Sequence, residues 1–343
     1  MKLQNIRLQN FRSYQDQTFD FNEGITIISG PNASGKTNLL EAILLLCCGQ
    51  TYRTSDIQDL VNKNSEWARI DGQFTKSKRV LKIKDSKKTF IIDDKEIVRF
   101  QSKYILPTVL FEPSQLQLLT YSPEMRRSLV DDILNQVNHE FVIVKKQYSQ
   151  ALRQRNSLLK TNNIGLIKSQ IFAWNIRLSE LASQYVQYRL KIIEEINKTL
   201  SNDYSEIAGT EHLVEIKYQS ATDLSTYASA VLHALDNNLE KDIARGFTGS
   251  GPHRDDIIIG INQKPLKTGA SRGEVRTTLL AIKLAESYVI EKVSGIKPML
   301  LLDDVYGELD YSRRNKLLIA TQKYQTIITT TQKNNSHYSI NFK

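Results

Sequence analysis

The chain has 343 residues and carries 46 lysines and arginines against 37 acidic residues, a formal net charge of +9 at pH 7. This length allows one large core or two modest domains, and the basic surplus favours a polyanionic partner, although it also suits a merely soluble surface. The two cysteines, Cys47 and Cys48, are neighbours in an apolar stretch, which argues against a disulfide framework or a metal site and predicts buried thiols in a reducing cytosol.

The N-terminal segment predicts strands rather than a targeting signal. No apolar stretch at the start has the length of a signal-peptide core, and no later run approaches the length of a membrane span, so we expect a soluble cytoplasmic protein. Apolar residues alternate with polar ones at Ile6 and Leu8 and again at Phe19 and Phe21. This period of two predicts a β-hairpin that leads into a buried strand at 25–29.

A glycine-rich loop follows that strand. Residues 30–37, Gly-Pro-Asn-Ala-Ser-Gly-Lys-Thr, fit the pattern G-x-x-x-x-G-K-[ST], in which backbone N–H groups surround an anion, the lysine reaches the outer phosphates and the hydroxyl binds Mg²⁺. The helix predicted at 37–46 would point its positive end at the phosphates. A plain glycine turn is the alternative. We predict a nucleotide site formed by Gly30, Pro31, Asn32, Ala33, Ser34, Gly35, Lys36, Thr37 and Asn38.

Residues 66–111 predict further strands and include a strongly basic run. Between 76 and 88 the chain has seven basic residues and one acidic residue, Asp85. Such a run is usually the solvated face of a hairpin, but in a basic nucleotide-binding protein it is also a candidate for contacts with DNA phosphates. No aromatic residue is interleaved, so contacts with the duplex backbone are favoured over base stacking. The candidate residues are Lys82, Lys84, Lys87 and Lys88.

The middle of the chain changes to helical texture from about residue 120. Apolar residues recur at spacings of three and four from Phe141 to Leu159, "KTNNIG" (160–165) interrupts the pattern, and the spacing resumes from Ile167 to Leu200. We predict two helices of about 25 residues in an antiparallel hairpin roughly 40 Å long; an ordinary bundle is the alternative. A strand at 212–218, a helix at about 222–244 and a loop at 246–256 should follow.

The C-terminal hundred residues return to an α/β pattern. The apolar strand "PMLLLDDV" ends in Asp303 and Asp304, which suits a magnesium carboxylate followed by a possible general base. The strand before the glycine-rich loop lies at the front of the chain and its expected sheet partners lie at the back. We therefore predict an α/β domain split between 1–122 and 245–343, with a helical domain inserted at 123–244.

The segment 269–287 contains a second candidate phosphate contact. Ser271 and Glu274 stand three residues apart before an apolar helix, the spacing of a capping box that satisfies free N–H groups. A capped helix start with Gly273 for close approach is also where the γ-phosphate of a second nucleotide could dock. The two roles are compatible.

These motifs together resemble the ABC-type ATPase heads of the SMC/Rad50 class, and within that class most closely the RecF family. The resemblance runs from end to end, and the short arm without a Cys-x-x-Cys hook is similar to that family and unlike Rad50. The segments that carry it are "LQNFRSY" (8–14), the loop at 30–37, "TYRTS" (51–55), "SPEMRRSLVDD" (122–132), "GFTGSGPHRDD" (246–256), "SRGE" (271–274), "LLLDDVYGELDYSRR" (301–314) and "TIITTT" (326–331).

The resemblance implies a P-loop ATPase head with an inserted helical arm and an ATP site shared by two chains. Lys36 would hold the β- and γ-phosphates, Thr37 and Asp303 the Mg²⁺, and Asp304 would orient or deprotonate the attacking water. The signature, Ser271, Arg272, Gly273 and Glu274, would cap the nucleotide of the partner chain. Asp310 would lie at the dimer seam, and Arg53 would link nucleotide to DNA, although a surface arginine is an equal alternative.

Three departures from the family pattern predict slow turnover or a weaker dimer. Glu274 stands where the family usually has glutamine, and its carboxylate would repel a partner's γ-phosphate unless capping holds it away. Asp304 stands where the usual residue is glutamate, whose side chain is one methylene longer. The last strand ends in Thr330, Thr331 and Gln332, so it offers no strong base. For the glutamine loop, "FEPSQLQ" (111–117) covers the region, with Gln115 as the candidate.

The function that follows from the resemblance is an ATP-gated DNA-binding dimer that joins on ATP, holds duplex or gapped DNA and is released by slow hydrolysis. The resemblance further implies help in loading recombinase through RecR-like and RecO-like partners. Two alternatives stay open: an ABC ATPase subunit of a transporter, and a nucleotide-sensing clamp without useful turnover.

Overall fold

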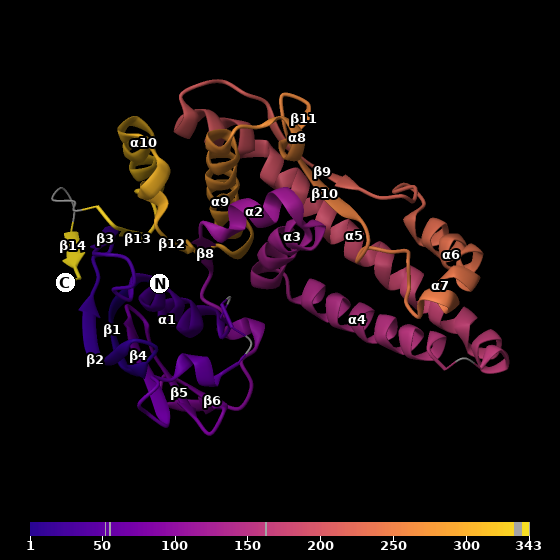
Figure 1. Cartoon of the computed structure of the whole chain (residues 1–343), viewed down its shortest axis with the longest axis horizontal. Coiled ribbons are helices and arrows are strands. Elements are labelled where there is room, and N and C mark those ends of the chain that lie inside the picture. Colours follow the sequence, from indigo (N-terminus) through magenta and orange to yellow (C-terminus); the bar gives the residue numbers. More distant parts are fainter. Residues whose placement is uncertain (52, 55, 162, 333–337, 343) are drawn as a thin grey trace. The chain divides into compact units, whose positions relative to one another are not determined.

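The computed structural model describes residues 1–51, 53–54, 56–161, 163–332 and 338–342 (Figure 1). The chain forms two compact units. The first comprises Met1–Leu116, Asn202–Glu211 and Arg272–Lys343, and the second comprises Gln117–Ser201 and His212–Ser271. Residues 245–271, which the sequence analysis assigned to the α/β domain, belong to the second unit, because their main strand pairs there with the strand at Val214–Gln219.

The first unit contains a six-stranded antiparallel sheet in the order β2-β1-β4-β5-β6-β7. The predicted N-terminal hairpin and the strands predicted after residue 66 are confirmed. Side chains on one face of the sheet, such as Ile6, Ile70 and Leu81, are fully buried and join the same core as the helix α1 (Lys36–Cys48). The strands are β1 (Leu3–Phe11), β2 (Tyr14–Asp20), β4 (Trp67–Phe74), β5 (Ser77–Lys84), β6 (Lys87–Ile92) and β7 (Lys95–Ile97).

A second sheet of the first unit is parallel and carries the strand that precedes the glycine-rich loop. Its order is β14-β3-β13-β12-β8, and every pairing is parallel. The predicted pairing between the front and the back of the chain is therefore confirmed, and β14 is a strand that the sequence analysis missed. The strands are β3 (Ile25–Ser29), β8 (Thr108–Phe111), β12 (Met299–Leu302), β13 (Thr326–Thr330) and β14 (Tyr338–Asn341).

Helices complete the first unit. Cys47 is buried and Cys48 half-buried on α1, and burial raises the pKa of Cys47 to about 11. The elements are α1 (Lys36–Cys48), η1 (Gln58–Leu60), η2 (Ser102–Tyr104), α9 (Arg272–Ser294), η3 (Val305–Glu308) and α10 (Tyr311–Thr321), and α2 (Ser114–Tyr121) runs from the first unit into the second.

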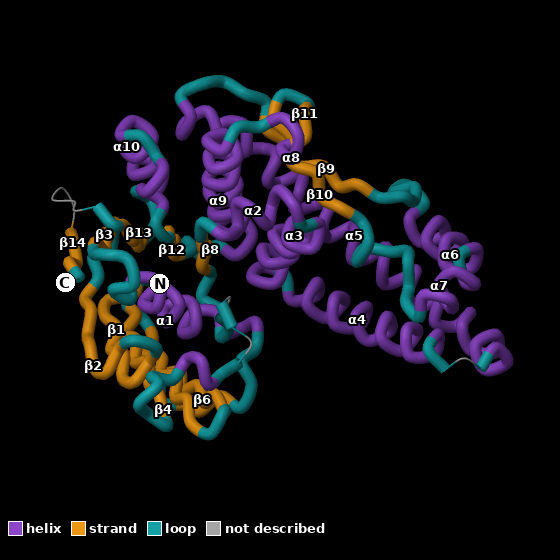
Figure 2. The backbone as a smooth tube through the Cα atoms, viewed as in Figure 1, coloured by secondary structure: helices purple, strands orange, loops and turns teal. Residues whose placement is uncertain are grey.

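The second unit is mostly helical (Figure 2). Its helices are α3 (Pro123–Val137), α4 (His139–Leu159), α5 (Ile164–Ala208), α6 (Tyr227–Asn237), α7 (Leu239–Arg245) and α8 (Leu266–Gly269), and its small sheet has β9 (Val214–Gln219), β10 (Asp256–Ile261) and β11 (Lys264–Pro265). The predicted helix at 222–244 is two helices, because Asn238 leaves the helical conformation. Among the described residues, no helix has the length and apolar character that a membrane crossing requires.

The predicted helical hairpin is present, but its helices differ in length. Arg155 contacts Asn175, and Arg177 contacts Gln147, so α4 and α5 run antiparallel. α4 has 21 residues, whereas α5 has 45, and the prediction of about 25 is wrong for α5. The apolar spacing continues past Leu200 through the buried residues Tyr204 and Ile207, and the last turns of α5 belong to the first unit.

Candidate nucleotide-binding site

The glycine-rich loop has the backbone that its pattern predicts. β3 ends at Ser29 and α1 begins at Lys36, with Gly35 in the left-handed region at φ 103°. The Tyr14 hydroxyl donates to the Gly35 carbonyl at 2.9 Å, and a Cβ on Gly35 would lie 2.9 Å from that hydroxyl oxygen. A Cβ on Gly30 would lie 2.6 Å from the Cβ of Phe342. Both glycines are therefore required by the geometry of the loop.

The Lys36 ammonium lies inside this loop. Its Nζ donates to the carbonyls of Gly30 at 2.8 Å and Pro31 at 2.7 Å, and the residue is 7% exposed. Burial lowers the pKa of Lys36, while the charges of Asp304 and Asp303 raise it. The lysine is thus held where the pattern needs a cation for phosphate oxygens.

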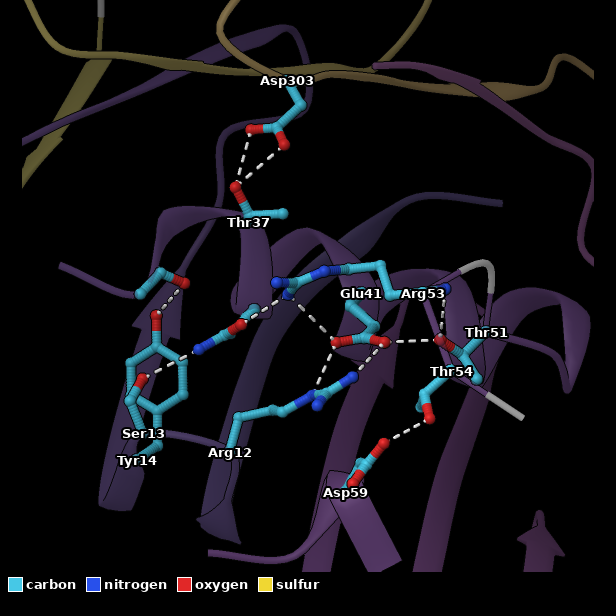
Figure 3. Close-up of polar contacts among 12 residues, drawn as sticks. Arg12, Ser13, Tyr14, Thr37, Glu41, Thr51, Arg53, Thr54, Asp59 and Asp303 are labelled. Atoms are coloured by element: carbon cyan, nitrogen blue, oxygen red, sulfur yellow. Dashed lines mark hydrogen bonds and ion pairs between the residues drawn. The ribbon is translucent and has the colours of Figure 1, made fainter. Parts of the chain in front are cut away.

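Thr37 and Asp303 meet at one edge of the parallel sheet, although they are 266 positions apart in sequence (Figure 3). The Thr37 hydroxyl donates to Asp303 Oδ2 at 2.8 Å, and the Thr329 hydroxyl donates to Oδ1 at 2.5 Å. Asp303 directly follows β12 and Thr329 lies in β13, so parallel strands bring these oxygens together. A hydroxyl beside a carboxylate is a ligand set that suits Mg²⁺.

Asp304 has an uncommon backbone conformation next to this pair. Its φ is 44°, in the left-handed region, and its N–H donates to the Thr329 hydroxyl at 2.9 Å. The negative charge of its carboxylate acts to raise the pKa of Lys36. Left-handed backbone outside glycine is often found at functional sites.

Arg53 is tied to α1 through a buried carboxylate that the sequence analysis missed (Figure 3). Arg53 Nη1 donates to Asn38 Oδ1 at 2.7 Å and to Glu41 Oε2 at 3.5 Å. Glu41 is fully buried, and Arg12 binds it with Nε and Nη2, each at 2.9 Å. The glutamate within the apolar run "NLLEAILLL" could have indicated this contact, because a buried charge needs a partner. Tyr52 and Ser55 of "TYRTS" lie outside the described residues.

Glu112 is a second carboxylate that the sequence analysis missed. It directly follows β8, the strand beside β12. Burial raises the pKa of Glu112, and the charge of Asp303 raises it further, while Arg53 and Lys283 act in the opposite direction. Gln115, the predicted glutamine-loop residue, accepts a hydrogen bond from the Glu112 N–H at 3.4 Å, and its role stays a prediction.

The signature residues stand at the start of a long helix. α9 begins at Arg272, with Ser271 directly before it and Glu274 in its first turn. Asp310 caps α10, and its Oδ1 accepts from the Arg313 N–H at 2.8 Å. The roles of Ser271, Gly273 and Asp310 towards a second chain stay predictions.

The basic hairpin divides its lysines between two faces. Asp85 and Ser86 form the turn with positive φ, so Lys84 pairs with Lys87 across β5 and β6, and Ile83 pairs with Lys88. Lys82, Lys84 and Lys87 therefore share the exposed face, whereas Lys88 lies on the face of the buried Ile83 and is half-buried. Burial lowers the pKa of Lys88. This placement corrects the expectation of one solvated face for all four.

An aromatic side chain stands beside the exposed lysines. Trp67 on β4 pairs with Lys84 on β5 and is 42% exposed. The basic run itself contains no aromatic residue, and Trp67 comes from the neighbouring strand β4.

The "GPHRDD" loop is bonded within the second unit. The ring of His253 lies between the Tyr148 hydroxyl, at 2.6 Å from Nδ1, and the Thr248 carbonyl, at 3.1 Å from Nε2. Burial lowers the pKa of His253 to about 4, so the ring is neutral at pH 7. Asp255 accepts from the Tyr218 hydroxyl at 2.7 Å. These contacts give the loop a structural role in that unit.

Comparisons with known proteins cover nearly the whole chain. Residues 2–341 match the model of the RecF/RecN/SMC N-terminal domain. The DNA replication and repair protein RecF of Lactobacillus gasseri is 34% identical over 348 residues, covering 96% of this chain and 92% of the relative. The protein of that name from Microcystis aeruginosa is 34% identical over 350 residues, with coverages of 96% and 93%.

Solved structures agree with the sequence matches. A structure of the recombination mediator protein RecF with ATP in the RecFOR pathway has a TM-score of 0.85 and 28% identity, covering 98% of this chain and 93% of that one. The SMC head bound to the C-terminal winged-helix domain of ScpA has a TM-score of 0.57 and 18% identity, with coverages of 97% and 90%, and supports the fold alone.

Proposed function

The chain belongs to the RecF/RecN/SMC family, and within it to the RecF proteins, and on this premise we propose that it is an ATP-dependent DNA-binding protein of recombinational repair and replication restart. The observation that carries the proposal is the meeting of Thr37, from the glycine-rich loop, with Asp303, from the end of β12. A phosphate loop needs such a carboxylate beside its hydroxyl to bind a metal-nucleotide complex.

Different residues of the site would bind the phosphates, hold the metal ion and orient the attacking water. The Lys36 ammonium would leave the carbonyls of Gly30 and Pro31 for the outer phosphates, since phosphate oxygens are stronger acceptors for a cation. Thr37 and Asp303 would hold Mg²⁺, which when bound supplies positive charge to the phosphates. Asp304 would orient the attacking water, and its short side chain favours slow hydrolysis.

Dimerisation would complete the site. We expect the signature at 271–274 to contact the γ-phosphate of a nucleotide on a second copy, with Asp310 at the seam between the copies. ATP would then join two chains on DNA, and slow hydrolysis would release them. The exposed lysines Lys82, Lys84 and Lys87 are the candidates for DNA phosphates, because they share one solvent-facing side of the sheet.

We infer the biological setting of the protein from that of its relatives. We expect action in the cytoplasm on duplex or gapped DNA, with RecR-like and RecO-like partners that help to load recombinase. A transporter subunit is not supported, because the matched relatives are named for DNA replication and repair.

The experiment is to size the protein with ATP, with ADP and without nucleotide, each with and without duplex DNA, beside a Lys36→Ala control. We expect a dimer to form with ATP but not with ADP or without nucleotide. We expect this dimer to bind DNA more tightly than the monomer does. A protein that binds ATP yet keeps one size in all six conditions contradicts the proposal. Phosphate release measured in the same samples distinguishes an ATPase from a clamp without turnover.

A further inference from the structure

Arg313, in the first turn of α10, lies against the signature. Its Nη1 is 3.6 Å from the position that a Cβ on Gly273 would occupy. The guanidinium therefore rests beside the backbone of the signature glycine, in space that any larger residue at this position would contact. Gly273 is exposed and Arg313 is half-buried, and both belong to the first unit.

The neighbouring signature residue carries the opposite charge. Glu274 is half-buried in the first turn of α9. Burial raises the pKa of the Tyr204 hydroxyl, the charge of Glu274 raises it further, and the charge of Arg313 lowers it. The carboxylate and the guanidinium thus act on the same hydroxyl, that of Tyr204 in the last turns of α5.

Arg313 forms only a weak ion pair with Asp310, the residue that caps its own helix. Its Nε is 3.6 Å from Asp310 Oδ2, with side-chain exposures of 34% for Arg313 and 57% for Asp310. Ion pairs this exposed contribute little, because water screens both charges. The positive charge of Arg313 therefore also acts on other anions near Gly273.

The charge of Glu274 is unfavourable for a phosphate at this helix start. The N-terminal end of a helix the length of α9 attracts anions through the helix dipole. A carboxylate in the first turn offsets that attraction and repels a second anion directly. A cation beside Gly273 reverses the balance.

We propose that Arg313 is a positioning residue of the shared ATP site, where it compensates the charge of Glu274 so that the signature attracts the γ-phosphate of a nucleotide on a second copy of this chain. This inference rests on the proposed function. The positive charge that attracts the phosphate then comes from α10, whereas the signature itself stands at the start of α9.

The test is a double-mutant cycle with Arg313→Gln, Glu274→Gln and the combined variant, using full-length protein without DNA. Sedimentation gives the dissociation constant of the dimer in saturating ATP, and ATP affinity is measured separately on dilute monomer. Arg313→Gln should weaken the dimer roughly tenfold, the equivalent of one interaction of about 1.4 kcal/mol, and leave monomer affinity unchanged. When Glu274→Gln is already present, the same change should cost less than about threefold, because the charge that needs compensation is absent.

Two control variants distinguish a loss of dimer affinity caused by the missing charge from one caused by disturbed folding. Arg99→Gln removes one positive charge from an exposed position of the first unit and should leave dimerisation at the parental level. Arg313→Lys keeps the charge and should retain most of the dimer affinity. Near-parental dimerisation by Arg313→Lys also shows that Arg313→Gln fails for lack of charge rather than through a disturbed cap of α10.

The outcomes distinguish this inference from the proposed function. A parental protein that binds ATP but never dimerises overturns both. A dimerising parent with an Arg313→Gln variant of equal affinity overturns the inference alone. A loss of dimer affinity that is the same with and without the Glu274→Gln change also overturns it, since Arg313 would then act independently of Glu274.

Discussion

Asp304 combines a left-handed backbone with a place beside the nucleotide loop, so its side chain can be changed with little effect on the fold. Asparagine tolerates a φ of 44° as well as aspartate does. Asp304→Asn should therefore fold normally and bind Mg-ATP through Thr37 and Asp303, but it should hydrolyse ATP roughly 10²- to 10⁴-fold more slowly, the usual range for removal of a general base. Phosphate release and the fraction of ATP-bound dimer are the measurements. Hydrolysis at the parental rate would mean that another group activates the water.

Glu41 is a buried charged residue whose loss should destabilise the fold. Glu41→Ala removes the fully buried carboxylate that holds Arg12 and Arg53. Breaking a buried ion pair costs about 3–5 kcal/mol, but both arginines reach solvent, so we expect about 2–3 kcal/mol less free energy of unfolding, measured with denaturant. Glu41→Gln, which keeps the size of the side chain, should lose less.

A surface pair provides the control for Glu41. Asp16→Ala removes an exposed partner of Arg7 and should barely change the unfolding midpoint. Equal effects of Glu41→Ala and Asp16→Ala would show that the Glu41 network adds no stability.

At the scale of residues, motif spacing predicted some contacts and could not predict others. The pairing of Thr37 with Asp303 was expected, because the loop pattern and the apolar strand each specify one ligand of the same ion. Glu41 and Glu112 were missed, since a carboxylate gains a role from partners that come from distant segments, such as Arg12 for Glu41. Arg313 was missed for the same reason: its neighbour Gly273 lies on another helix.

At the scale of elements, apolar runs located the parallel strands except β14, whereas the faces of the basic hairpin depended on the exact position of its turn. The turn at 85–86 fixes the register of β5 and β6, and a shift of one residue would have moved each lysine to the other face. Because the sequence alone left the turn position open, Lys88 was grouped with the exposed lysines. The length of α5 was underestimated because its apolar spacing passes from one compact unit into the other.

The two faces of the hairpin give a matched test of DNA binding. Replacing Lys82, Lys84 and Lys87 with glutamine should lower DNA affinity and flatten the plot of log affinity against log salt by about 0.9 for each DNA phosphate that is no longer neutralised. Lys88→Gln removes a lysine from the same hairpin but from its half-buried face, and should leave the slope unchanged. An unchanged slope in the triple variant would identify the run as a solvated face that does not touch DNA. Sequence preference should stay weak in every variant.

At the scale of the whole molecule, the sequence order of the strands was enough to predict a split α/β unit. β3 pairs with β13 and β14, so strands from the two ends of the chain lie side by side in one sheet. The boundary at 245 could not be predicted, because β10 is as apolar as a strand of the α/β unit and only its pairing with β9 assigns it to the second unit. The division that was predicted, 1–122 with 245–343 around 123–244, stays a proposal for how the chain works as domains.

The proposed sharing of ATP sites between two copies can be tested by mixing defective chains. If Ser271 only caps α9, Ser271→Arg should cost on the order of 1 kcal/mol of stability and leave ATPase activity per folded chain nearly intact. If Ser271 also contacts the γ-phosphate of the second copy, the larger side chain should block dimerisation while each monomer still binds ATP. Dimerisation at the parental level by Ser271→Arg alone would rule out the signature role.

Lys36→Ala is the complementary defect, because it damages the loop and leaves the signature intact. A mixed dimer of the two variants would hold one intact shared site, with the loop of the Ser271→Arg chain and the signature of the Lys36→Ala chain, beside one site that is damaged twice. Two inactive proteins should therefore regain part of the ATP-dependent dimerisation when mixed, and hydrolysis as well if one site is sufficient. A site contained within one chain cannot be repaired by mixing, so dimerisation and hydrolysis that both stay at the level of the separate variants would argue against sharing or show that both sites must be filled.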